Sequence, residues 1–184
     1  MIDDIERLML ALKFASEKHA QQRRKDSENT PYINHPIAVA ELLCRIGKVR
    51  EPEVIIAAIL HDTIEDTDTK AEEIAQLFGD RVLRLVLECT DDKSLPKEER
   101  KRLQIVNAPH KSPEAKQIKI ADKTNNVFAL YTSPPSSWSW QRKSDYLDWT
   151  EKVVDGLKGV NVALDKNYFE NLAAARSALQ AKSD

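Results

Sequence analysis

The segment that most constrains the fold is a run of seven apolar residues that ends at a histidine and several acids. Residues 54–60 (VIIAAIL) would be apolar on every side of a helix, and Pro52 suits the first turn of that helix. A helix without a polar face has to be packed on all sides. The sequence therefore predicts a central, buried helix that starts at Pro52.

The residues after this run, HDTIEDTDT (61–69), are strongly polar. If the helix continues, side chains four residues apart lie above one another, so His61, Asp62, Glu65 and Asp66 form one patch. Acids at the carboxyl end of a helix are disfavoured unless a cation is near. A bound metal ion would supply that cation. These residues alone leave open an alternative in which the helix simply emerges into solvent and residues 67–68 cap the next helix.

The rest of the chain is also rich in residues that favour helices. Only 4 of the 184 residues are glycine, and few stretches show the two-residue alternation of β-branched side chains that is typical of strands. A chain of this length, 41% hydrophobic, can bury one well-formed core. We expect an all-α fold, and a single domain spanning residues 1–184.

Helical periodicity, interrupted by proline and glycine, predicts where the helices lie. The stretches RRKDSENTPYINHP (23–36) and TSPPSSWSW (132–140) are rich in turn formers and are expected to be loops. Besides the helix from Pro52 through the acidic segment, helices are expected at about residues 5–22, 36–44, 68–79, 80–90, 96–106, 113–131, 141–157 and 162–181.

Charge and cysteine usage exclude several classes of protein. The net charge of −2 and the lack of a basic stripe interleaved with aromatics argue against a nucleic-acid partner, so Trp138, Trp140 and Trp149 are better explained by packing. Cys44 and Cys89 form no CxxC motif, no signal peptide opens the chain, and no apolar run approaches the roughly 20 residues of a membrane span. We expect a soluble cytoplasmic protein with reduced thiols and no membrane partner.

Two further residues are candidate metal ligands. His35 lies at the start of a predicted helix, and Asp122 lies in the apolar helix KIADKTNN, where an unpaired carboxylate would be costly to bury. A single histidine or aspartate is more often structural. Together with His61 and Asp62, however, these residues suit a divalent ion that keeps open water positions, more like manganese than a thiol-rich zinc site. The sequence therefore predicts a catalytic metal site assembled by folding.

The same residues carry a resemblance to a known family. The order His35, His61-Asp62, Asp122 is similar to the HD superfamily of metal-dependent phosphohydrolases. The strings RRKDSENTPYINHP, AAILHDTIEDT, FGDRV and KIADKTNN resemble the hydrolase domain of the Rel/Spo family. The resemblance extends from about residue 6 to residue 168. Because no synthetase or regulatory segment follows, it is closest to the small stand-alone, Mesh-type alarmone hydrolases, which implies a single-domain, HD-type bundle of helices.

The resemblance implies an activity and a set of roles. Enzymes of this family use Mn²⁺ to remove the 3′-pyrophosphate of (p)ppGpp, leaving GDP or GTP. The four ligands would hold the Mn²⁺ ion, while Glu65 and Asp66 would handle the attacking water. Two neighbouring carboxylates titrate as a coupled set, so one can accept a proton while the other orients the water. Which of the two is the base stays open.

The resemblance also implies a nucleotide pocket. Asn126 lies one helical turn after Asp122 and faces the same way. Tyr146, with Arg142 and Lys143 nearby, is expected to close the pocket, although such helices also carry these residues for packing. The predicted substrate-binding residues are Arg24, Lys25, Tyr32, Asn126, Lys143 and Tyr146. A basic cluster of Lys97, Arg100, Lys101 and Arg102 either attracts the polyanion or is an exposed face.

The sequence departs from the long bifunctional enzymes of the family in two places. The insertion DSENT separates Lys25 from Pro31, and IADKTNN replaces the commoner LADRLHN. Both departures bear on recognition of the base, so two alternatives stay open: an NADPH phosphatase, and a non-catalytic nucleotide-binding regulator on the same fold. The intact Glu65-Asp66 pair argues against the regulator.

Overall fold

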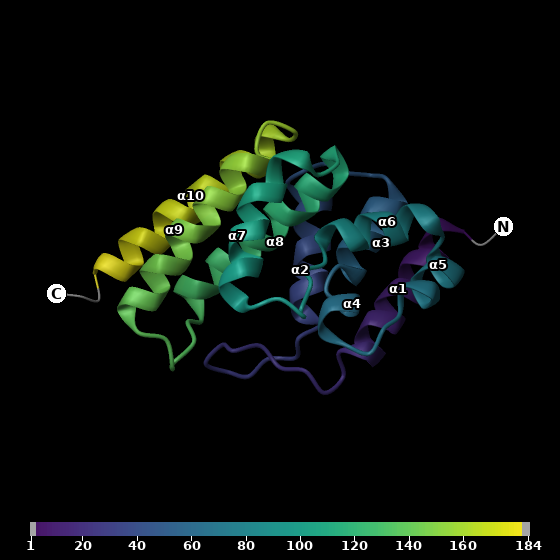
Figure 1. Cartoon of the computed structure of the whole chain (residues 1–184), viewed down its shortest axis with the longest axis horizontal. Helices are drawn as coiled ribbons and strands as arrows, with labels where there is room; N and C mark the ends of the chain where they lie inside the picture. Colours follow the sequence, from purple (N-terminus) through teal and green to yellow (C-terminus); the bar gives the residue numbers. More distant parts are fainter. Residues whose placement is uncertain (1–2, 182–184) are drawn as a thin grey trace.

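The computed structural model describes residues 3–181, and helices account for most of them (Figure 1). Within that range no strand forms, and Arg23 and Pro31 make only an isolated antiparallel bridge. The all-α prediction is confirmed. The helices are α1 (Asp4–Lys18), α2 (Asn34–Arg45), α3 (Pro52–Leu60), α4 (Thr63–Asp66), α5 (Ala71–Phe78), α6 (Asp80–Cys89), α7 (Lys97–Asn107), the 3₁₀ helix η1 (Ala108–His110), α8 (Pro113–Thr132), α9 (Trp140–Leu157) and α10 (Val162–Gln180).

Helix α3 lies at the centre of the N-terminal half, as its apolar sequence predicts. Every residue from Val54 to Leu60 is buried. Helices α1, α2, α6 and α8 all contact α3. Because full burial of one large aliphatic side chain contributes about 1.5–3 kcal/mol, this helix anchors the elements around it.

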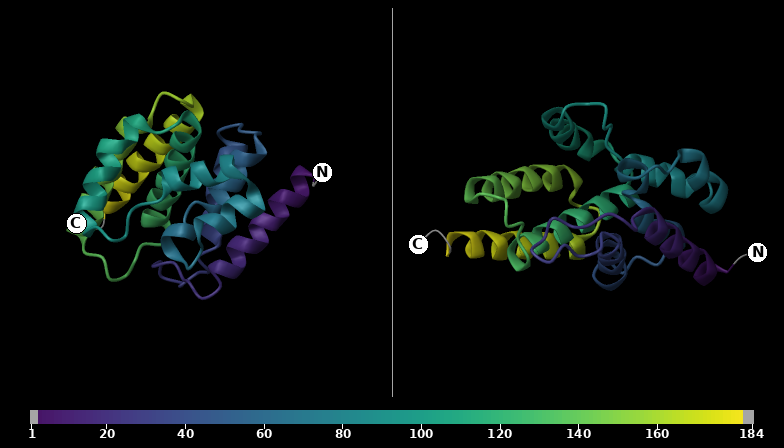
Figure 2. Two further views of the ribbon diagram at one scale, coloured as in Figure 1. Left: turned by 45° about the vertical axis from the view of Figure 1, so that its right-hand side comes forward. Right: turned by 90° about the horizontal axis from the view of Figure 1, so that it is seen from below.

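Helix α8 connects the two halves of the molecule. Pro113 occupies its first turn, and the Ser112 hydroxyl accepts a hydrogen bond from the Ala115 amide. It contacts α2, α3 and α6 as well as α9 and α10. Helices α9 and α10 run side by side at the opposite end of the molecule from α1 and α5 (Figures 1 and 2). A polar residue on α8 is therefore placed between the two halves.

The central helix does not continue through the acidic segment, so that prediction is wrong. Helix α3 ends at Leu60, residues 61–62 form a turn, and the short helix α4 follows. The Thr63 hydroxyl donates to the Leu60 carbonyl oxygen at 2.7 Å and so competes for a helical acceptor. The grouping of His61 and Asp62 with Glu65 and Asp66 therefore results from a turn between two helices.

Two other predicted helix ends are wrong for reasons of local hydrogen bonding. Helix α1 ends at Lys18, before the predicted residue 22, because the chain turns and the Gln22 amide donates to the His19 carbonyl oxygen at 2.9 Å. Neither residue 67 nor residue 68 caps α5. Its cap is Lys70, whose amide donates to the Glu73 carboxylate at 2.7 Å.

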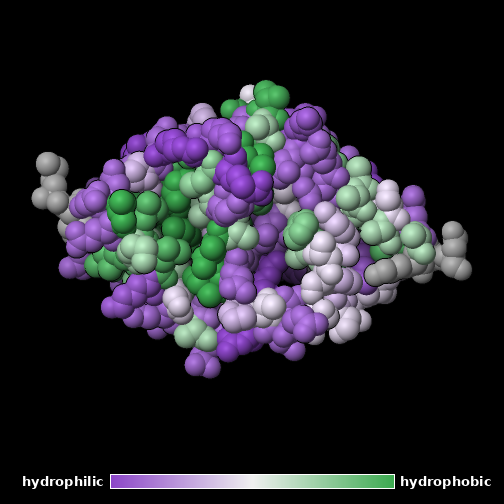
Figure 3. Space-filling view, turned by 180° about the vertical axis from the view of Figure 1, so that it is seen from behind, coloured by the Kyte–Doolittle hydropathy of each residue, from purple (hydrophilic) through white to green (hydrophobic). Residues whose placement is uncertain are grey.

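The face of the molecule seen in Figure 3 is mostly hydrophilic but carries a group of apolar side chains. Seen from behind, they lie on the half of the molecule that carries the N-terminal helix (Figure 3). Ile5 and Met9 of α1 are 68% and 60% exposed. Between residues 3 and 181, no helix combines the length and the hydropathy needed to cross a membrane.

Gly156 provides a test of how tightly α9 packs on η1. A Cβ atom at this position would lie 2.8 Å from the Cβ of the buried Ala108. An alanine gains up to about 1 kcal/mol in helix propensity, but overpacking costs about 1–3 kcal/mol. We expect Gly156→Ala to lower the free energy of unfolding by about 1–2 kcal/mol in urea denaturation.

Lys152→Ala, an exposed substitution in the same helix, is the control and should change the free energy of unfolding by less than about 0.5 kcal/mol. A Gly156→Ala protein as stable as the control would show that η1 can move aside at no cost.

Candidate metal centre and adjoining cleft

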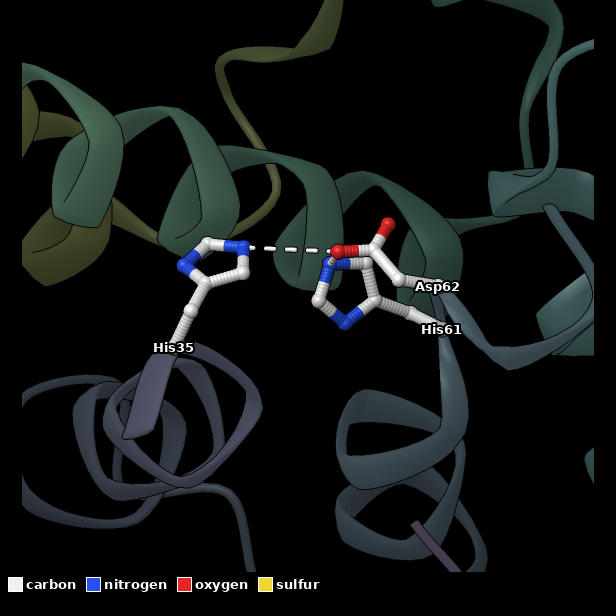
Figure 4. A group of neighbouring side chains, drawn as sticks. All are labelled: His35, His61 and Asp62. Carbon is white, nitrogen blue, oxygen red and sulfur yellow. Dashed lines mark ion pairs between the residues drawn. The ribbon is translucent and has the colours of Figure 1, made fainter. Parts of the chain in front are cut away.

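Two histidines and an aspartate from two separate elements converge in front of α8 (Figure 4). His35 comes from α2, and His61 and Asp62 come from the turn between α3 and α4. Asp62 Oδ2 lies 3.6 Å from His35 Nε2 and 3.1 Å from His61 Nε2. One ligand atom from each residue lies within 4.8 Å of the others. The three side chains thus surround a common point, and we call them the ligand triangle.

Asp122, the fourth predicted ligand, lies beside this triangle. It belongs to α8, and its Oδ1 atom is 3.2 Å from His35 Nε2. Its Oδ2 atom faces two buried lysines, Lys123 at 3.1 Å and Lys119 at 3.7 Å. The structure therefore brings all four residues to one place, with Asp122 approaching the triangle from the His35 side.

The hydrogen bonds of the two imidazoles show which ring nitrogen is free. His61 Nδ1 lies 2.8 Å from the Ala58 carbonyl oxygen, which can only accept, so Nδ1 carries the hydrogen. His35 Nδ1 lies 2.7 Å from Asn125 Oδ1 in the same way. A neutral ring bound through Nδ1–H presents a bare Nε2 lone pair, which is the state of a metal-ligating histidine.

The surroundings of His61 Nε2 provide the test of whether a metal ion fits. This nitrogen is buried without a hydrogen-bond partner, although Asp62 Oδ2 is 3.1 Å away. A bare ring nitrogen and an ionised carboxylate oxygen repel each other at this distance unless a positive charge lies between them. Two nitrogen donors and one or two carboxylate oxygens suit a divalent ion, so the residues fit a metal.

Buried lysines keep Asp122 ionised. Burial alone would raise the pKa of this carboxyl group, but the positive charges of Lys123 and Lys119 outweigh it and hold the pKa well below its usual range. Lys119 also donates to the Cys89 carbonyl oxygen at 3.2 Å, which fixes its position. Asp122 is therefore a carboxylate ready to bind a cation throughout the physiological pH range.

The two predicted catalytic carboxylates have different surroundings. Glu65 Oε2 accepts a hydrogen bond from the Asp91 amide at 3.0 Å, and burial raises the pKa of the Glu65 carboxyl group. Asp66 accepts from the Gln22 side-chain amide at 3.1 Å and forms an ion pair with Lys93. The side chains line two different cavities.

The first cavity, of about 360 Å³, contains five of the predicted substrate-binding residues. The Arg24 guanidinium lies 5.7 Å from the centre of the Tyr32 ring and donates to Asn126 Oδ1 at 2.9 Å. Asp66 faces the same space. The predicted residues that line it are Arg24, Lys25, Tyr32, Asn126 and Tyr146. Side chains from the 19–33 loop, α8 and α9 thus enclose one cleft.

Lys143 does not reach this cleft. It lines a separate small hollow with residues of α8 and α10. Arg142 lies one full turn before Tyr146 and so shares its face of α9, whereas Lys143 is rotated by about 100° from Arg142. Arg142 lines a second cavity next to this cleft, and its guanidinium lies 4.3 Å from the centre of the Trp138 ring.

A second cavity, of about 780 Å³, adjoins the first because both are lined by Lys25, Trp138 and Tyr146. Glu65 and Arg142 also face this second space. Of the predicted basic cluster, Lys97, Arg100 and Lys101 line it, whereas Arg102 pairs with Glu99 on the exposed side of α7. The cleft therefore combines an aromatic compartment with a basic one.

The residues that hold the site in place were not identified from the sequence. Asn125 supports His35, and Lys119 and Lys123 neutralise Asp122. Asn125 occupies the position at which LADRLHN has histidine, so the departure from that motif was a signal. Lysines at positions 119 and 123 of an apolar helix were a second signal, since buried lysines are rare without a partner.

Comparisons with known proteins show which family the chain resembles. The HD domain family model matches residues 11–119. The guanosine-3′,5′-bis(diphosphate) 3′-pyrophosphohydrolases MESH1 of Danio rerio and Homo sapiens are each 52% identical over 159 residues, covering 86% of this chain and 88% and 89% of theirs. The solved structure of a metazoan SpoT ortholog that hydrolyses ppGpp has a TM-score of 0.89 and 46% identity, covering 91% of this chain and 94% of that chain. These matches confirm the resemblance seen in the motifs.

Asn125 tests whether His35 is a metal ligand. Its Oδ1 atom holds the His35 Nδ1–H group, and removal of such a support typically lowers metal affinity or activity by about 10–100-fold. We expect Asn125→Leu to weaken Mn²⁺ binding by about this factor, measured by calorimetric titration. Asn125→Asp retains an acceptor and should bind within about threefold of the parent protein. Unchanged affinity in the leucine variant would contradict the role assigned to His35.

Proposed function

This chain belongs to the HD domain family, and on that premise we propose that it is a metal-dependent (p)ppGpp 3′-pyrophosphohydrolase that releases GDP or GTP and pyrophosphate. The observation that carries the proposal is the ligand triangle of His35, His61 and Asp62, with a bare buried nitrogen, beside a cleft with aromatic and basic compartments. The MESH1 relatives named for this activity resemble the chain over most of its length.

We infer that the ion is Mn²⁺, held by His35, His61, Asp62 and Asp122. Imidazole and carboxylate donors without a thiolate support a metal of this class. When bound, a divalent ion supplies Lewis-acid polarisation of a phosphoryl oxygen and acidification of a water molecule. The ionised state of Asp122 and the hydrogen bonds at Nδ1 of both histidines leave the Asp122 carboxylate and the two Nε2 atoms as the groups that would hold the ion.

Glu65 is our candidate for the general base. Its raised pKa makes it a better proton acceptor than an ordinary surface carboxylate, because its basicity is closer to that needed near neutral pH. The Asp91 amide fixes Oε2, and Oε1, which lies 3.8 Å from Arg100 Nη1, is the oxygen that would receive the proton of the attacking water. Asp66, held by Gln22, then orients the water. As the water oxygen bonds to phosphorus, the ribose 3′-oxygen leaves and takes up a proton.

The two compartments suit a nucleotide that carries phosphates on two sides of the ribose. The Arg24 guanidinium above Tyr32 offers a planar cation for stacking on the base. Lys25, Lys97 and Arg142 offer charge-assisted hydrogen bonds to phosphate oxygens in the basic compartment. An NADPH phosphatase is the second candidate, since a phosphate beside a ribose could enter the same cleft.

We further propose that residues 1–184 form a single phosphohydrolase domain. The family model stops at residue 119, but Asp122 and Asn126 of α8 and Arg142 and Tyr146 of α9 lie beyond it. These four side chains border the triangle or the cleft. Helices α8 and α9 therefore supply part of the site itself.

The central assay is pyrophosphate release from ppGpp by the Mn²⁺-loaded protein. We expect release of GDP and pyrophosphate in equal amounts, lost on chelation with EDTA, because the triangle then lacks its cation. NADPH in a parallel reaction tests the second substrate by release of inorganic phosphate. Binding of ppGpp without any pyrophosphate release would identify a nucleotide-binding regulator and contradict the proposed activity.

Two substitutions separate metal binding from proton transfer. Asp122→Ala should abolish metal retention and turnover together, because it removes a ligand and leaves two buried lysines unpaired. Glu65→Gln should keep the metal and lower kcat by about 10²–10⁴-fold, the usual contribution of a general base. Metal content and kcat are measured on the same preparations. Equal loss of metal in both variants would mean that Glu65 is a ligand and not the base.

A further inference from the structure

The fold leaves one buried histidine without a role in the chemistry above. His19 follows α1 and is 2% exposed. Its ring lies against Tyr32, with 4.9 Å between ring centroids, and its Nδ1 atom is 2.6 Å from Gln22 Oε1. Its Nε2 atom is buried without a hydrogen-bond partner among the described residues. Because the buried His19 ring forms a hydrogen bond through Nδ1 alone, that bond can fix the orientation of the Gln22 side chain.

Gln22 connects this histidine to the predicted catalytic pair. Its Nε2 atom lies 3.1 Å from Asp66 Oδ2, and its Oε1 atom lies 2.6 Å from His19 Nδ1. An ionised carboxylate can only accept, so Gln22 has to present its NH₂ group to Asp66 and its oxygen to His19. His19 Nδ1 must then carry the hydrogen. Only this arrangement of protons allows both hydrogen bonds of the Gln22 amide.

The backbone of the same turn ties this chain of hydrogen bonds to the ligand triangle. The Tyr32 amide donates to the Gln22 carbonyl oxygen at 3.1 Å, and the Tyr32 hydroxyl donates to Asp62 Oδ2 at 2.7 Å. The loop therefore donates one hydrogen bond to the triangle, from Tyr32, and one to Asp66, from Gln22. The His19 ring packs against Tyr32 and is hydrogen-bonded to Gln22.

The other partner of Asp66 is a weaker constraint. Lys93 pairs with Asp66 Oδ1, but its side chain is 49% exposed, and such ion pairs are screened by solvent and contribute little. Gln22 is the neutral and partly buried partner. An amide free to rotate could instead turn its oxygen toward Asp66, which would repel the carboxylate. The His19 hydrogen bond opposes that rotation from the other end of the amide, together with the repulsion by Asp66 itself.

We propose that His19 is a positioning residue, which fixes the amide of Gln22 so that Asp66 is held in one orientation beside the reacting water. The inference rests on the proposed hydrolase function, and it assigns His19 no contact with the substrate. Burial lowers the pKa of His19, so the ring is neutral near neutral pH, as the single Nδ1–H requires.

Two substitutions separate hydrogen bonding from packing at this position. His19→Phe keeps an aromatic ring against Tyr32 but removes the donor, and His19→Asn places an amide NH₂ near the position of Nδ1 but removes the ring. We expect His19→Phe to lower kcat by about 10–100-fold with unchanged KM and Mn²⁺ content, and His19→Asn to recover most of that loss. His110→Phe, at an exposed position of η1, is the matched control and should leave kcat unchanged. Greater activity in the phenylalanine variant than in the asparagine variant would show a packing role and overturn the proposal.

A double-mutant cycle shows whether His19 acts through Asp66. In an Asp66→Asn background, His19→Phe should have little further effect on kcat, because the group that it positions is already altered. The same fold-loss in both backgrounds would overturn the proposal. Gln22→Leu removes the side chain that links His19 to Asp66, so it should lower kcat by a similar factor to His19→Phe. It replaces His19→Phe in the test if that variant fails to fold.

One measurement on the parent protein does not depend on turnover. Imidazole ¹⁵N chemical shifts of the Mg²⁺-loaded protein report which ring nitrogen of His19 carries the hydrogen. We expect the Nδ1–H form near pH 7, lost or exchanging in Gln22→Leu. An Nε2–H form would overturn the positioning role even in an active enzyme. If His19 has the Nδ1–H form but the protein does not hydrolyse ppGpp, the result contradicts the proposed function and leaves the hydrogen-bond arrangement of His19 intact.

Discussion

The site depends on two electron-pair donors, His61 Nε2 and Asp62 Oδ2, which are held 3.1 Å apart. The Ala58 carbonyl oxygen takes the Nδ1 hydrogen of His61, so the bare Nε2 atom faces Asp62 Oδ2 with no hydrogen bond between them. Such an arrangement is stable only if a positive charge, either a proton on Nε2 or a metal ion, lies between the two atoms. The surrounding fold keeps these atoms buried and close together. A divalent ion bound between them would supply the positive charge that they require and would also activate the substrate and water.

The site forms between a fully buried apolar helix, α3, and the polar residues of α8. Helix α3 is apolar all round and fully buried, so the turn at its end is rigidly placed. Helix α8 brings Asp122 and its two lysines from the opposite direction, and the loop after α1 reaches the same centre through Tyr32 and Gln22. Both metal binding and catalysis therefore draw on segments that are far apart in the sequence, held by one hydrophobic core.

The sequence predicts much of this but not the local hydrogen bonds. An apolar run shows that α3 is central, and the order of two histidines and two aspartates indicates a metal site before any contact is known. The turn at His61 was missed because it depends on a Thr63 hydroxyl competing for a backbone carbonyl oxygen. Lys143 was placed in the cleft because a one-residue difference on a helix rotates a side chain by about 100°, which proximity in sequence does not reveal. The role of His19 requires tertiary contacts across 44 residues, from Gln22 to Asp66.

The most direct test is the anomalous diffraction of crystals grown with Mn²⁺, recorded on both sides of the manganese absorption edge. We predict one strong peak in coordination contact with His35 Nε2, His61 Nε2 and carboxylate oxygens of Asp62 and Asp122. A map without a peak there, or with its only manganese elsewhere on the protein, would contradict the metal centre and the hydrolase function built on it.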